Sequence, residues 1–435
     1  MQNLILKTDS YKASHWRQYP PGTEIVYSYL ESRGGKFGQV KFFGLQYILK
    51  KHFLQKVTLN DVEQADKFFS QHFGDVRIFN KEGWGKLVKK HNGNLPISVK
   101  AVREGTVNDI LTPLIVVQNT DPEFPWITNY VETLLMQVWY PITVATLSYQ
   151  IKKLLSLYLE RTGSPNLIDF KLHDFGFRGV SSVESAGIGG AAHLLNFKGT
   201  DTLEGILLVQ EYYGAKEMVG HSIPAAEHST ITSWGRENEA DAFKNMIKQF
   251  GSGSVYAVVS DSFDIYKACS NLWGDKLKKE VLNANGTLVI RPDSGDPVAV
   301  ILGCLDILER KFGSSINEQG FKVLPDKIRL IQGDGIDYSM LYDILVSLTL
   351  SGWSADNIVF GMGGGLLQDV NRDTQQFAFK CSAIRKDGIW EDVYKDPITD
   401  KGKRSKRGRV DESKMLEVFR DGELLVDYVW EELAS

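Results

Sequence analysis

Charged residues and glycines follow directly after several short apolar runs in the middle of the chain. Residues 287–290 lead into Arg291-Pro292-Asp293-Ser294-Gly295, and residues 328–331 lead into Gln332-Gly333-Asp334-Gly335. Residues 255–259 precede Ser260-Asp261-Ser262, and residues 358–360 precede Gly361-Met362-Gly363-Gly364-Gly365. Arginine and the backbone N–H groups of glycine-rich turns bind phosphate, whereas Asp binds sugar hydroxyls or a hydrated cation. The pattern predicts one site for an anionic, hydroxyl-rich ligand together with a metal ion.

Amphipathic segments separate these apolar runs and position the predicted site. The runs begin about 30–40 residues apart, which is the length of a βαβ unit. Helical spacing of apolar residues predicts helices over 264–269, 298–308 and 339–346. Strand–helix alternation predicts a parallel sheet, and polar residues at the strand ends favour a barrel with its site at the carboxyl face. We expect an α/β barrel-like domain over residues 161–376.

The two ends of the chain have a different pattern. Strands are predicted over 25–30 and 97–102, and helices over 46–53 and 126–140. The tail contains short alternating strands such as 424–430. We expect both ends to build one second domain, α+β or sandwich-like, over residues 1–160 and 377–435.

The composition narrows the class of protein. The chain has 435 residues, of which 43% are hydrophobic, and this suffices for more than one domain. A net charge of -4 gives no reason to expect general nucleic-acid binding. Cys269, Cys304 and Cys381 lack the CxxC spacing of zinc or redox sites. With no signal peptide and no apolar run of about 18 residues, we expect a soluble cytoplasmic protein.

The glycine run and two aspartates at the predicted rim could each have a structural role instead of binding a ligand. Four glycines within residues 361–365 favour close approach of the backbone to a ligand over a tight βα turn alone. Asp293 and Asp334 are each typical of a helix N-cap, but two of them beside Arg291 favour a ligand site.

Two further motifs stay open on residue type alone. After a predicted strand over 168–172, Phe175 and Arg178 are equally compatible with stacking on a flat heterocycle and with a core Phe beside a surface Arg. His228 follows Pro224-Ala225-Ala226-Glu227, and a lone histidine is more often structural than catalytic.

The basic run 401–409 has three interpretations. A solvated loop is the usual one. A polyphosphate-binding site comes second, and a nucleic-acid patch comes third because no aromatic residues are interleaved with the basic ones.

The chain resembles the nicotinamide phosphoribosyltransferases from about residue 6 to its tail. The matching motifs are Asp9-Ser10-Tyr11-Lys12, Gln18-Tyr19-Pro20-Pro21, His173-Asp174-Phe175-Gly176 with Arg178-Gly179, Asn196-Phe197-Lys198-Gly199-Thr200-Asp201-Thr202, Pro224-Ala225-Ala226-Glu227-His228-Ser229-Thr230, Arg291-Pro292-Asp293-Ser294-Gly295, Gln332-Gly333-Asp334-Gly335 and Gly363-Gly364-Gly365-Leu366-Leu367-Gln368. Loops 32–39 and 410–416 are shorter than in the animal enzymes. The resemblance implies a type II phosphoribosyltransferase fold in a head-to-tail homodimer with sites at the interface. It also implies that nicotinamide reacts with 5-phosphoribosyl 1-pyrophosphate to give nicotinamide mononucleotide and pyrophosphate.

The resemblance assigns a substrate-binding set. Its members are Asp9, Tyr11, Phe175, Arg178, Asp201, Ser222, Ala225, Ser260, Arg291, Asp293, Gly333, Asp334, Gly363, Gly364, Arg372 and Lys380. Phe175 and Tyr11 of the partner subunit sandwich the pyridine ring, and Asp201 accepts a hydrogen bond from the carboxamide while repelling nicotinate. The pyrophosphate meets Arg178 and Arg291. The ribose hydroxyls meet Asp293, Gly333 and Asp334, and the 5′-phosphate meets Gly363, Gly364 and Arg372 with Lys380 nearby.

The resemblance also implies catalytic roles and coupling to ATP. His228 accepts a phosphoryl group from ATP, and Asp264 orients its other ring nitrogen. Mg²⁺ and the arginines stabilise the leaving pyrophosphate, so His228, Asp264, Arg291 and Asp293 form the catalytic set. Lys395 and Lys403 contact ATP phosphates. The metal ligands stay unassigned, although Glu227 is one candidate.

Three other functions compete with this one. A nicotinate phosphoribosyltransferase is the nearest alternative, and Asp201 argues against it. An aldolase or isomerase barrel needs a reactive lysine or enolising acid at a strand end, and we find no such lysine within the predicted barrel strands. A partner-binding protein that has kept only the fold would not need the pocket residues Phe175, Asp201, His228, Arg291 and Asp293.

Overall fold

The computed structural model describes residues 3–434, which form two compact units. Unit 1 comprises the described residues within Met1–Thr146, Val209–Ala215 and Asn371–Ser435, and unit 2 comprises Leu147–Leu208 and Lys216–Val370. The predicted domain limits, 1–160 with 377–435 and 161–376, stay a prediction, because compactness does not establish which segments fold independently. Within residues 3–434, no helix is both long enough and apolar enough to span a membrane.

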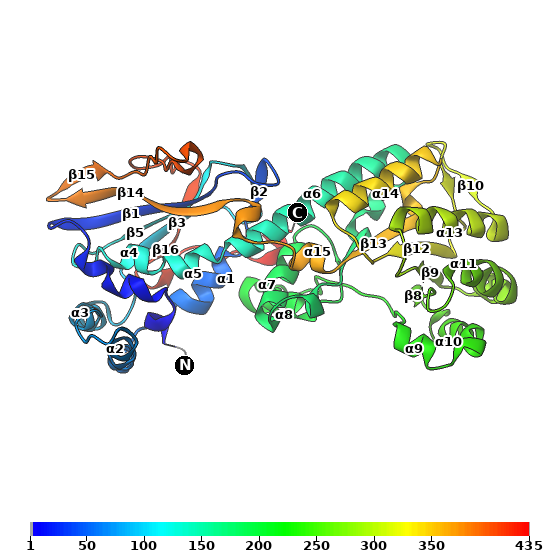
Figure 1. Ribbon diagram of the computed structural model, residues 1–435, viewed down its shortest axis with the longest axis horizontal. Helices are drawn as coiled ribbons and strands as arrows, with labels where there is room; N and C mark the ends of the chain where they lie inside the picture. Colours follow the sequence, from blue (N-terminus) through cyan, green and yellow to red (C-terminus); the bar gives the residue numbers. More distant parts are fainter. Residues whose placement is uncertain (1–2, 435) are drawn as a thin grey trace. The chain divides into compact units, whose positions relative to one another are not determined.

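Unit 1 is built around a seven-stranded antiparallel sheet (Figure 1). Its strands, in spatial order, are β15 (Ile389–Asp392), β14 (Phe377–Lys386), β1 (Thr23–Ser32), β5 (Pro113–Asn119), β3 (Ile97–Val102), β16 (Met415–Arg420) and β17 (Glu423–Leu424). β1 pairs with β14 from Thr23↔Lys386 to Ser32↔Phe377. Strands from both ends of the chain therefore share one sheet, and this confirms the predicted α+β unit.

Helices and a small two-stranded antiparallel sheet complete unit 1. They are α1 (Leu45–Ile48), α2 (Leu59–Phe73), α3 (Lys81–His91), α4 (Ile127–Tyr130), α5 (Glu132–Met136) and the strands β2 (Gln39–Lys41) and β4 (Val107–Asp109). Thr58 and Asp61 form a capping box that starts α2. The predicted helix over 46–53 is α1 continued by a π-helical turn, and the predicted helix over 126–140 is divided among α4, α5 and the start of α6 (Trp139–Thr162).

The predicted strand over 424–430 is wrong beyond Leu424. The backbone N–H of Tyr428 donates to the side chain of Gln46 at 2.7 Å, where a ladder partner would otherwise lie. Trp430 then begins a 3-10 helix and packs edge-on against Phe43 and Tyr213. Aromatic packing therefore ends the strand that the alternating pattern predicted.

Unit 2 contains a parallel sheet of six strands (Figure 1). Its order is β7 (Gly199–Thr200), β6 (Leu172–Asp174), β13 (Ile358–Met362), β12 (Ile328–Gln332), β9 (Thr287–Arg291) and β8 (Val255–Val259). Ala257, Val289 and Ile331 form a buried cluster across three of these strands. The strands are nearly continuous apolar runs, because helices cover their outer face and this apolar cluster lines the inner one.

The segment 221–226 joins the two edges of this sheet. At one edge, Thr200 of β7 donates to the carbonyl of His221 at 3.0 Å. At the other, Ala226 donates to the carbonyl of Ala257 on β8, also at 3.0 Å. The strands and this segment therefore form a closed ring, which confirms the predicted α/β barrel-like fold with an irregular segment in place of regular closing strands.

Helices surround the ring. They are α7 (Val183–Leu194), α8 (Leu203–Tyr213), α9 (His228–Thr232), α10 (Glu239–Phe250), α11 (Ile265–Lys267), α12 (Lys278–Asn283), α13 (Pro297–Phe312), α14 (Tyr338–Leu350) and α15 (Gly364–Leu367), with the small pair β10 (Ser315–Ile316) and β11 (Lys322–Val323). The predicted helices over 298–308 and 339–346 correspond to α13 and α14. The predicted strand over 168–172 is wrong: a 3-10 helix occupies Pro165–Phe170, and β6 begins at Leu172. Pro165 at the first helical position favours that turn.

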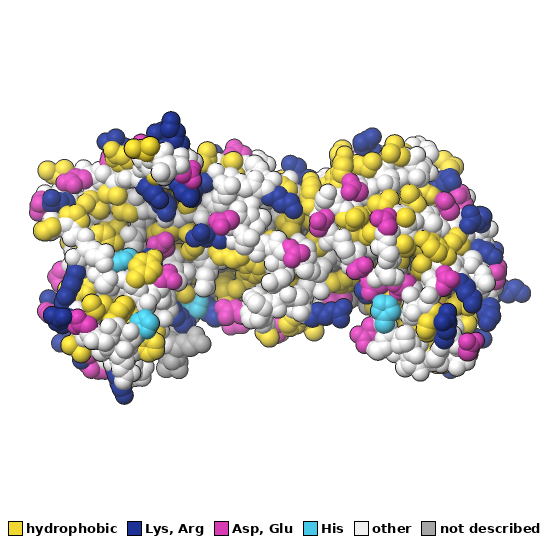
Figure 2. All heavy atoms as spheres, in the orientation of Figure 1, with side chains coloured by type: hydrophobic (Ala, Val, Ile, Leu, Met, Phe, Trp, Pro, Cys, Tyr) yellow, Lys and Arg dark blue, Asp and Glu magenta, His cyan; other side chains and the backbone are white. Residues whose placement is uncertain are grey.

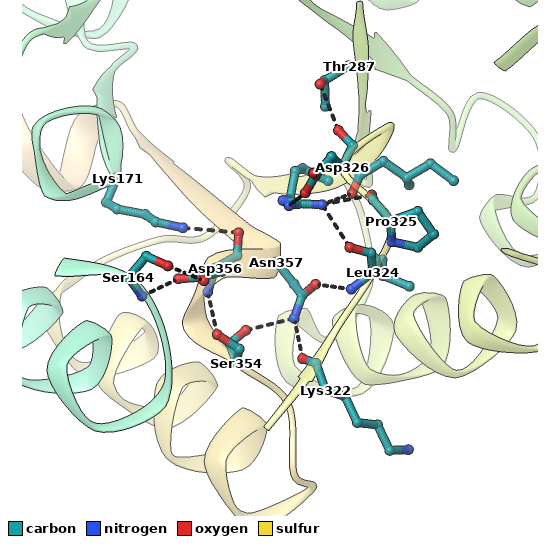
Figure 3. Close-up of polar contacts among 12 residues, drawn as sticks. Ser164, Lys171, Thr287, Lys322, Leu324, Pro325, Asp326, Ser354, Asp356 and Asn357 are labelled. Carbon is teal, nitrogen blue, oxygen red and sulfur yellow. Dashed lines mark hydrogen bonds and ion pairs between the residues drawn. The ribbon is translucent and has the colours of Figure 1, made fainter. Parts of the chain in front are cut away.

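A buried polar network lies at the amino ends of the strands (Figure 3). The Lys171 ammonium donates to the carbonyls of Ala355, Asp356 and Ile358 at 2.7, 3.2 and 2.8 Å. The Asp356 carboxylate accepts hydrogen bonds from the backbone and hydroxyl of Ser164, both at 2.8 Å. Burial lowers the pKa of Lys171 to about 7, and the charge of Asp356 opposes this shift.

Replacing Lys171 with Met is expected to lower the free energy of unfolding by about 2–4 kcal/mol, because buried carbonyl oxygens lose their donor. Chemical denaturation measures the change. Lys248→Met, on the exposed face of α10, is the control and should change stability by less than about 0.5 kcal/mol. Equal stability of the two variants would show that the network contributes nothing.

Candidate active site

A cavity of about 1200 Å³ runs along the inside of the ring in unit 2. Residues at the carboxyl ends of the strands and in the following loops line one end: His173, Phe175, Arg178, Asp201, Ser222, Ala225 and Arg291. The interior is apolar and is lined by Ala257, Val289, Ile331 and Val359. The other end reaches Lys171 and Asp356 of the buried polar network, together with Arg329 and the exposed Asp326. The cavity therefore brings six of the predicted substrate-binding residues together.

Phe175 lies at the carboxyl end of β6, over the glycines of two neighbouring strands. A Cβ at Gly361 would overlap its ring, and one at Gly333 would lie 3.0 Å from its Cε2 atom. The Arg291 guanidinium stands over the same ring, with Cζ 5.4 Å from the centroid. In this structure, glycine at 361 therefore accommodates the Phe175 ring. Approach of a ligand to Gly363 and Gly364 stays a prediction.

Asp201 follows β7 and presents its carboxylate to the cavity. Its Oδ1 atom accepts hydrogen bonds from His173 Nε2 at 3.0 Å and from the Ser222 hydroxyl. Burial opposes the charge, but the hydrogen bond and charge of His173, the Ser222 hydroxyl and the nearby Arg291 together hold the pKa of Asp201 below its ordinary value. The carboxylate is therefore ionised at neutral pH, and within residues 3–434 no hydrogen bond is made to Oδ2.

Arg291 and Asp293 form an ion pair at the end of β9, in which one carboxylate oxygen accepts two hydrogen bonds. Asp293 Oδ1 accepts from Arg291 Nε at 3.1 Å and from Nη2 at 2.6 Å. The other carboxylate oxygen of Asp293 lies 3.9 Å from His228 Nδ1. The helix N-caps in this part of the chain are Asp296 for α13 and Asp337 for α14. The N-cap alternative for Asp293 and Asp334 is therefore excluded.

His228 begins α9 and bonds to Asp261. Its Nε2 atom lies 2.9 Å from Asp261 Oδ1, while Asp261 Oδ2 accepts from the Asp293 backbone and the Ser294 hydroxyl. Burial opposes the charge of Asp261, but Ser294 and His228 hold the pKa of this carboxyl below its ordinary value. Asp261 thus joins His228 to the loop that carries Asp293.

Two predicted residues have other roles in this structure. Asp264 was expected to contact His228, but Asp261 makes this contact instead. Asp264 caps α11, where its side chain accepts a hydrogen bond from the Lys267 N–H at 3.0 Å. Ser260 is fully buried; its hydroxyl donates to the Val258 carbonyl and accepts from Trp273 Nε1 at 3.1 Å. The Ser260 side chain is therefore not available to a ligand. Sequence reasoning missed Asp261, although its position directly after a strand matched the pattern of Asp293.

The remaining predicted residues of this part of the chain lie at strand ends and are exposed or partly buried. Gly333 and Asp334 follow β12, and Gly363 and Gly364 follow β13. Asp334 is exposed, and its backbone carbonyl accepts from Gln332. These positions can meet a ligand from the carboxyl ends of the strands.

Unit 1 carries the other predicted residues. Tyr11 is 57% exposed and packs edge-on against His15, and Asp9 accepts from the Thr133 hydroxyl at 2.8 Å. Burial lowers the pKa of Lys380 on β14, and so do the charges of Arg33, Lys395 and Arg372, although Glu132 opposes them. Four cations therefore lie near one another, and Arg33 was missed because it lies outside the predicted motifs.

The basic run 401–409 is largely neutralised within unit 1. Arg404 pairs with Asp396 at 2.5 Å, Arg407 with Asp392 at 3.0 Å and Lys406 with Glu31 at 3.2 Å. Lys403 pairs with Asp400 at 3.4 Å. Figure 2 shows basic side chains next to acidic and hydrophobic ones over the part of unit 1 that contains β14 and β15. The pairing fits a folded loop better than a continuous nucleic-acid patch.

The fold of unit 2, with arginine, carboxylate and glycine residues on one rim, is that of a type II phosphoribosyltransferase barrel. A family model described as the nicotinate phosphoribosyltransferase (NAPRTase) family matches residues 170–423, and one described as the N-terminal domain of nicotinamide phosphoribosyltransferase matches residues 3–99. The chain therefore belongs to the NAPRTase family and, within it, to the nicotinamide phosphoribosyltransferases, which are pentosyltransferases.

Named relatives agree with this assignment. The chain is 54% identical to a nicotinamide phosphoribosyltransferase of Xanthomonas campestris, over 94% of this chain and 87% of the relative. It is 34% identical to one of Acinetobacter baylyi, over 98% and 90%. Among solved structures, nicotinate-nucleotide pyrophosphorylase from Pyrococcus furiosus has a TM-score of 0.60 at 14% identity, covering 99% of this chain and 94% of that one. Human nicotinic acid phosphoribosyltransferase has a TM-score of 0.50 at 16% identity, over 87% and 74%. At these identities, the two structures support the fold alone.

Gly361→Ala is expected to move the Phe175 ring and to lower the free energy of unfolding by about 1–3 kcal/mol, because the added methyl group overlaps the ring. A crystal structure of the variant and denaturation measure both effects. Gly85→Ala on α3, where a Cβ meets nothing within 4 Å, is the control and should be neutral or slightly stabilising. An unmoved ring in Gly361→Ala would contradict the steric account.

Proposed function

We propose that this protein transfers the 5-phosphoribosyl group from 5-phosphoribosyl 1-pyrophosphate to nicotinamide, forming nicotinamide mononucleotide and pyrophosphate. The observation that carries this proposal is the ionised Asp201 carboxylate in one cavity with Phe175 and Arg291. The relatives from Xanthomonas campestris and Acinetobacter baylyi are named for the same activity. The product serves NAD salvage.

Asp201 sets the choice between the two pyridine substrates. Its free Oδ2 accepts a hydrogen bond from the carboxamide NH₂ of nicotinamide. Nicotinate instead brings a second carboxylate beside it, and two like charges in a partly desolvated pocket repel each other by an amount on the order of several kcal/mol. The amide is therefore the preferred substrate.

The other substrate is held by the rim. Arg178 and Arg291 bind the pyrophosphate, because planar guanidinium groups match phosphate oxygens. The ribose hydroxyls bind to Asp293, Gly333 and Asp334. The 5′-phosphate binds to Gly363, Gly364, Arg372 and Lys380.

A second copy of the chain completes the pyridine pocket. Phe175 provides one stacking face, and Tyr11 of the partner subunit provides the other in a head-to-tail homodimer. The exposure of Tyr11 supports this role. The pyridine nitrogen attacks the anomeric carbon without losing a proton, so no general base is needed and positioning dominates.

Mg²⁺ fits this site as an ion bound mainly by the diphosphate. Within residues 3–434, no group of three or more His, Cys, Asp or Glu side chains is placed to hold a metal. Mg²⁺ commonly uses one or two carboxylates together with substrate phosphates and water. Asp293 is the carboxylate that would hold it, and when bound the ion neutralises charge on the leaving pyrophosphate.

We further propose that ATP phosphorylates His228 and that this reaction drives synthesis forward. Nε2 donates to Asp261, so Nδ1 keeps its lone pair and attacks the γ-phosphorus of ATP. The bond from that phosphorus to the bridging oxygen breaks, and ADP leaves with the electron pair. Water later cleaves the P–N bond and releases phosphate. Lys395 and Lys403 contact the ATP phosphates.

The nearest alternative is transfer to nicotinate, which the NAPRTase family description names. The direct experiment incubates the protein with 5-phosphoribosyl 1-pyrophosphate, Mg²⁺ and either pyridine at equal concentration, with and without ATP, and identifies the nucleotide. The proposal expects nicotinamide mononucleotide and faster synthesis with ATP. Nicotinate mononucleotide as the main product would overturn it.

Asp201→Asn should lower the amide-to-acid ratio of kcat/KM by about tenfold or more, because the variant removes the charge that repels nicotinate. Steady-state assays with each pyridine measure the ratio. Asp326→Asn, at the opposite end of the cavity, is the matched control and should keep the preference. An unchanged ratio in Asp201→Asn would refute the specificity argument.

His228→Ala should keep part of the basal synthesis and lose all stimulation by ATP, since the variant has no phosphoryl acceptor. Assays with and without ATP, and mass spectrometry after incubation with ATP, measure the two effects. Asp261→Asn should weaken stimulation, because Asp261 orients the ring. Persistent ATP stimulation in His228→Ala would show that another group accepts the phosphoryl group.

A further inference from the structure

His173 contacts both groups that would hold the pyridine ring. Its Nε2 atom lies 3.0 Å from Asp201 Oδ1, and its ring is tilted against the Phe175 ring with centroids 5.1 Å apart. It lines the cavity, and its side chain is only 13% exposed. Because an ionised carboxylate is only an acceptor, Nε2 must be the donor in this bond.

The packing around His173 fixes its ring. β6 and β7 pair with His173 opposite Gly199. A Cβ at Gly199 would lie 2.8 Å from His173 Nδ1, so only glycine allows the ring to lie this close to β7. The charged and titratable groups near this histidine are Asp201 after β7, Asp174 on β6 and His193 on α7. Of these, only Asp201 accepts a hydrogen bond from the ring in the described part of the chain.

The hydrogen bond restricts Asp201 in a specific way. The Asp201 side chain is 49% exposed and is not held by packing alone. His173 and Ser222 both donate to Oδ1. These two bonds restrict rotation of the carboxylate, and among the described residues they leave Oδ2 as the acceptor without a protein donor. A carboxylate that is already oriented binds its partner without a further entropic cost.

We propose that His173 is a positioning residue that orients the Asp201 carboxylate and thereby sets the preference for the amide over the acid. This inference rests on the proposed function, since it assigns to Asp201 the recognition of the carboxamide. His173 acts through Asp201 and does not itself contact the reacting atoms.

Three variants separate this role from packing against Phe175. His173→Phe keeps an aromatic ring beside Phe175 and removes the donor. His173→Gln removes the aromatic ring and keeps an N–H donor near the position of Nε2. His173→Ala removes both. His72→Phe, on α2 of unit 1 and outside the cavity, is the control for replacement of a histidine by phenylalanine.

Kinetics with nicotinamide and with nicotinate give the deciding readouts. His173→Phe should raise KM for nicotinamide by about tenfold, with a smaller change in kcat, and should lower the amide-to-acid ratio by a similar factor. His173→Gln should restore most of the ratio. In an Asp201→Asn background, His173→Phe should not lower the ratio further, because the two residues act as one unit.

The outcomes distinguish this inference from the proposed function. If the wild-type protein makes no nicotinamide mononucleotide, the proposed function fails. If the wild type prefers nicotinamide and Asp201→Asn abolishes that preference, but His173→Phe keeps both the ratio and KM, the positioning role of His173 is overturned. If His173→Phe does not fold, the other two variants decide. An amide-to-acid ratio that is lowered in His173→Ala and restored in His173→Gln supports the positioning role. Equal ratios in those two variants overturn it.

Discussion

The closed ring of parallel strand pairs is the constraint on which the site depends. Because the carboxyl ends of parallel strands share one edge, Phe175, Arg291 and Asp334 lie on one rim although they are far apart in the sequence. The segment 221–226 closes the ring by bonding to β7 and β8. That short segment also carries Ser222 to the Asp201 carboxylate and leads into His228, so ring closure positions both the proposed pyridine pocket and the proposed phosphoryl acceptor.

Three carboxylates of the rim share a second feature, because each is paired with a cationic or titratable group. Asp201 bonds to His173, Asp261 to His228 and Asp293 to Arg291. Each pairing uses one side of the carboxylate and fixes its direction, and hydrogen bonds keep Asp201 and Asp261 ionised despite partial burial. Preorganised charges of this kind suit a reaction in which a neutral nucleophile displaces a highly charged leaving group.

Much of this arrangement could be predicted from the sequence, because apolar runs followed by Asp, Arg or Gly mark strand ends in any α/β barrel. The pattern predicted the parallel unit and the rim positions of Arg291, Asp293 and Asp334. It did not distinguish Asp261 from Asp264, which lie in the same strand–turn–helix segment. Which of them caps the helix depends on where the helix starts, and that position varies by a residue or two with local packing.

Other errors have the same origin in tertiary contacts. The alternating residues after Leu424 are typical of a strand, yet Gln46 and the aromatic cluster around Trp430 take over its hydrogen bonding and packing. The burial of Ser260 depends on Trp273, which lies thirteen residues further along the chain. The contact of Gly361 with the Phe175 ring likewise joins two distant segments, and the glycine run alone did not reveal it.

A crystal structure with bound nicotinamide mononucleotide and pyrophosphate tests the central claim most directly. The account predicts the pyridine ring stacked on Phe175, its carboxamide nitrogen at hydrogen-bonding distance from Asp201 Oδ2, and the pyrophosphate at Arg291. A nucleotide whose ring lies away from Phe175, or whose carboxamide turns its oxygen rather than its NH₂ toward Asp201, would contradict it.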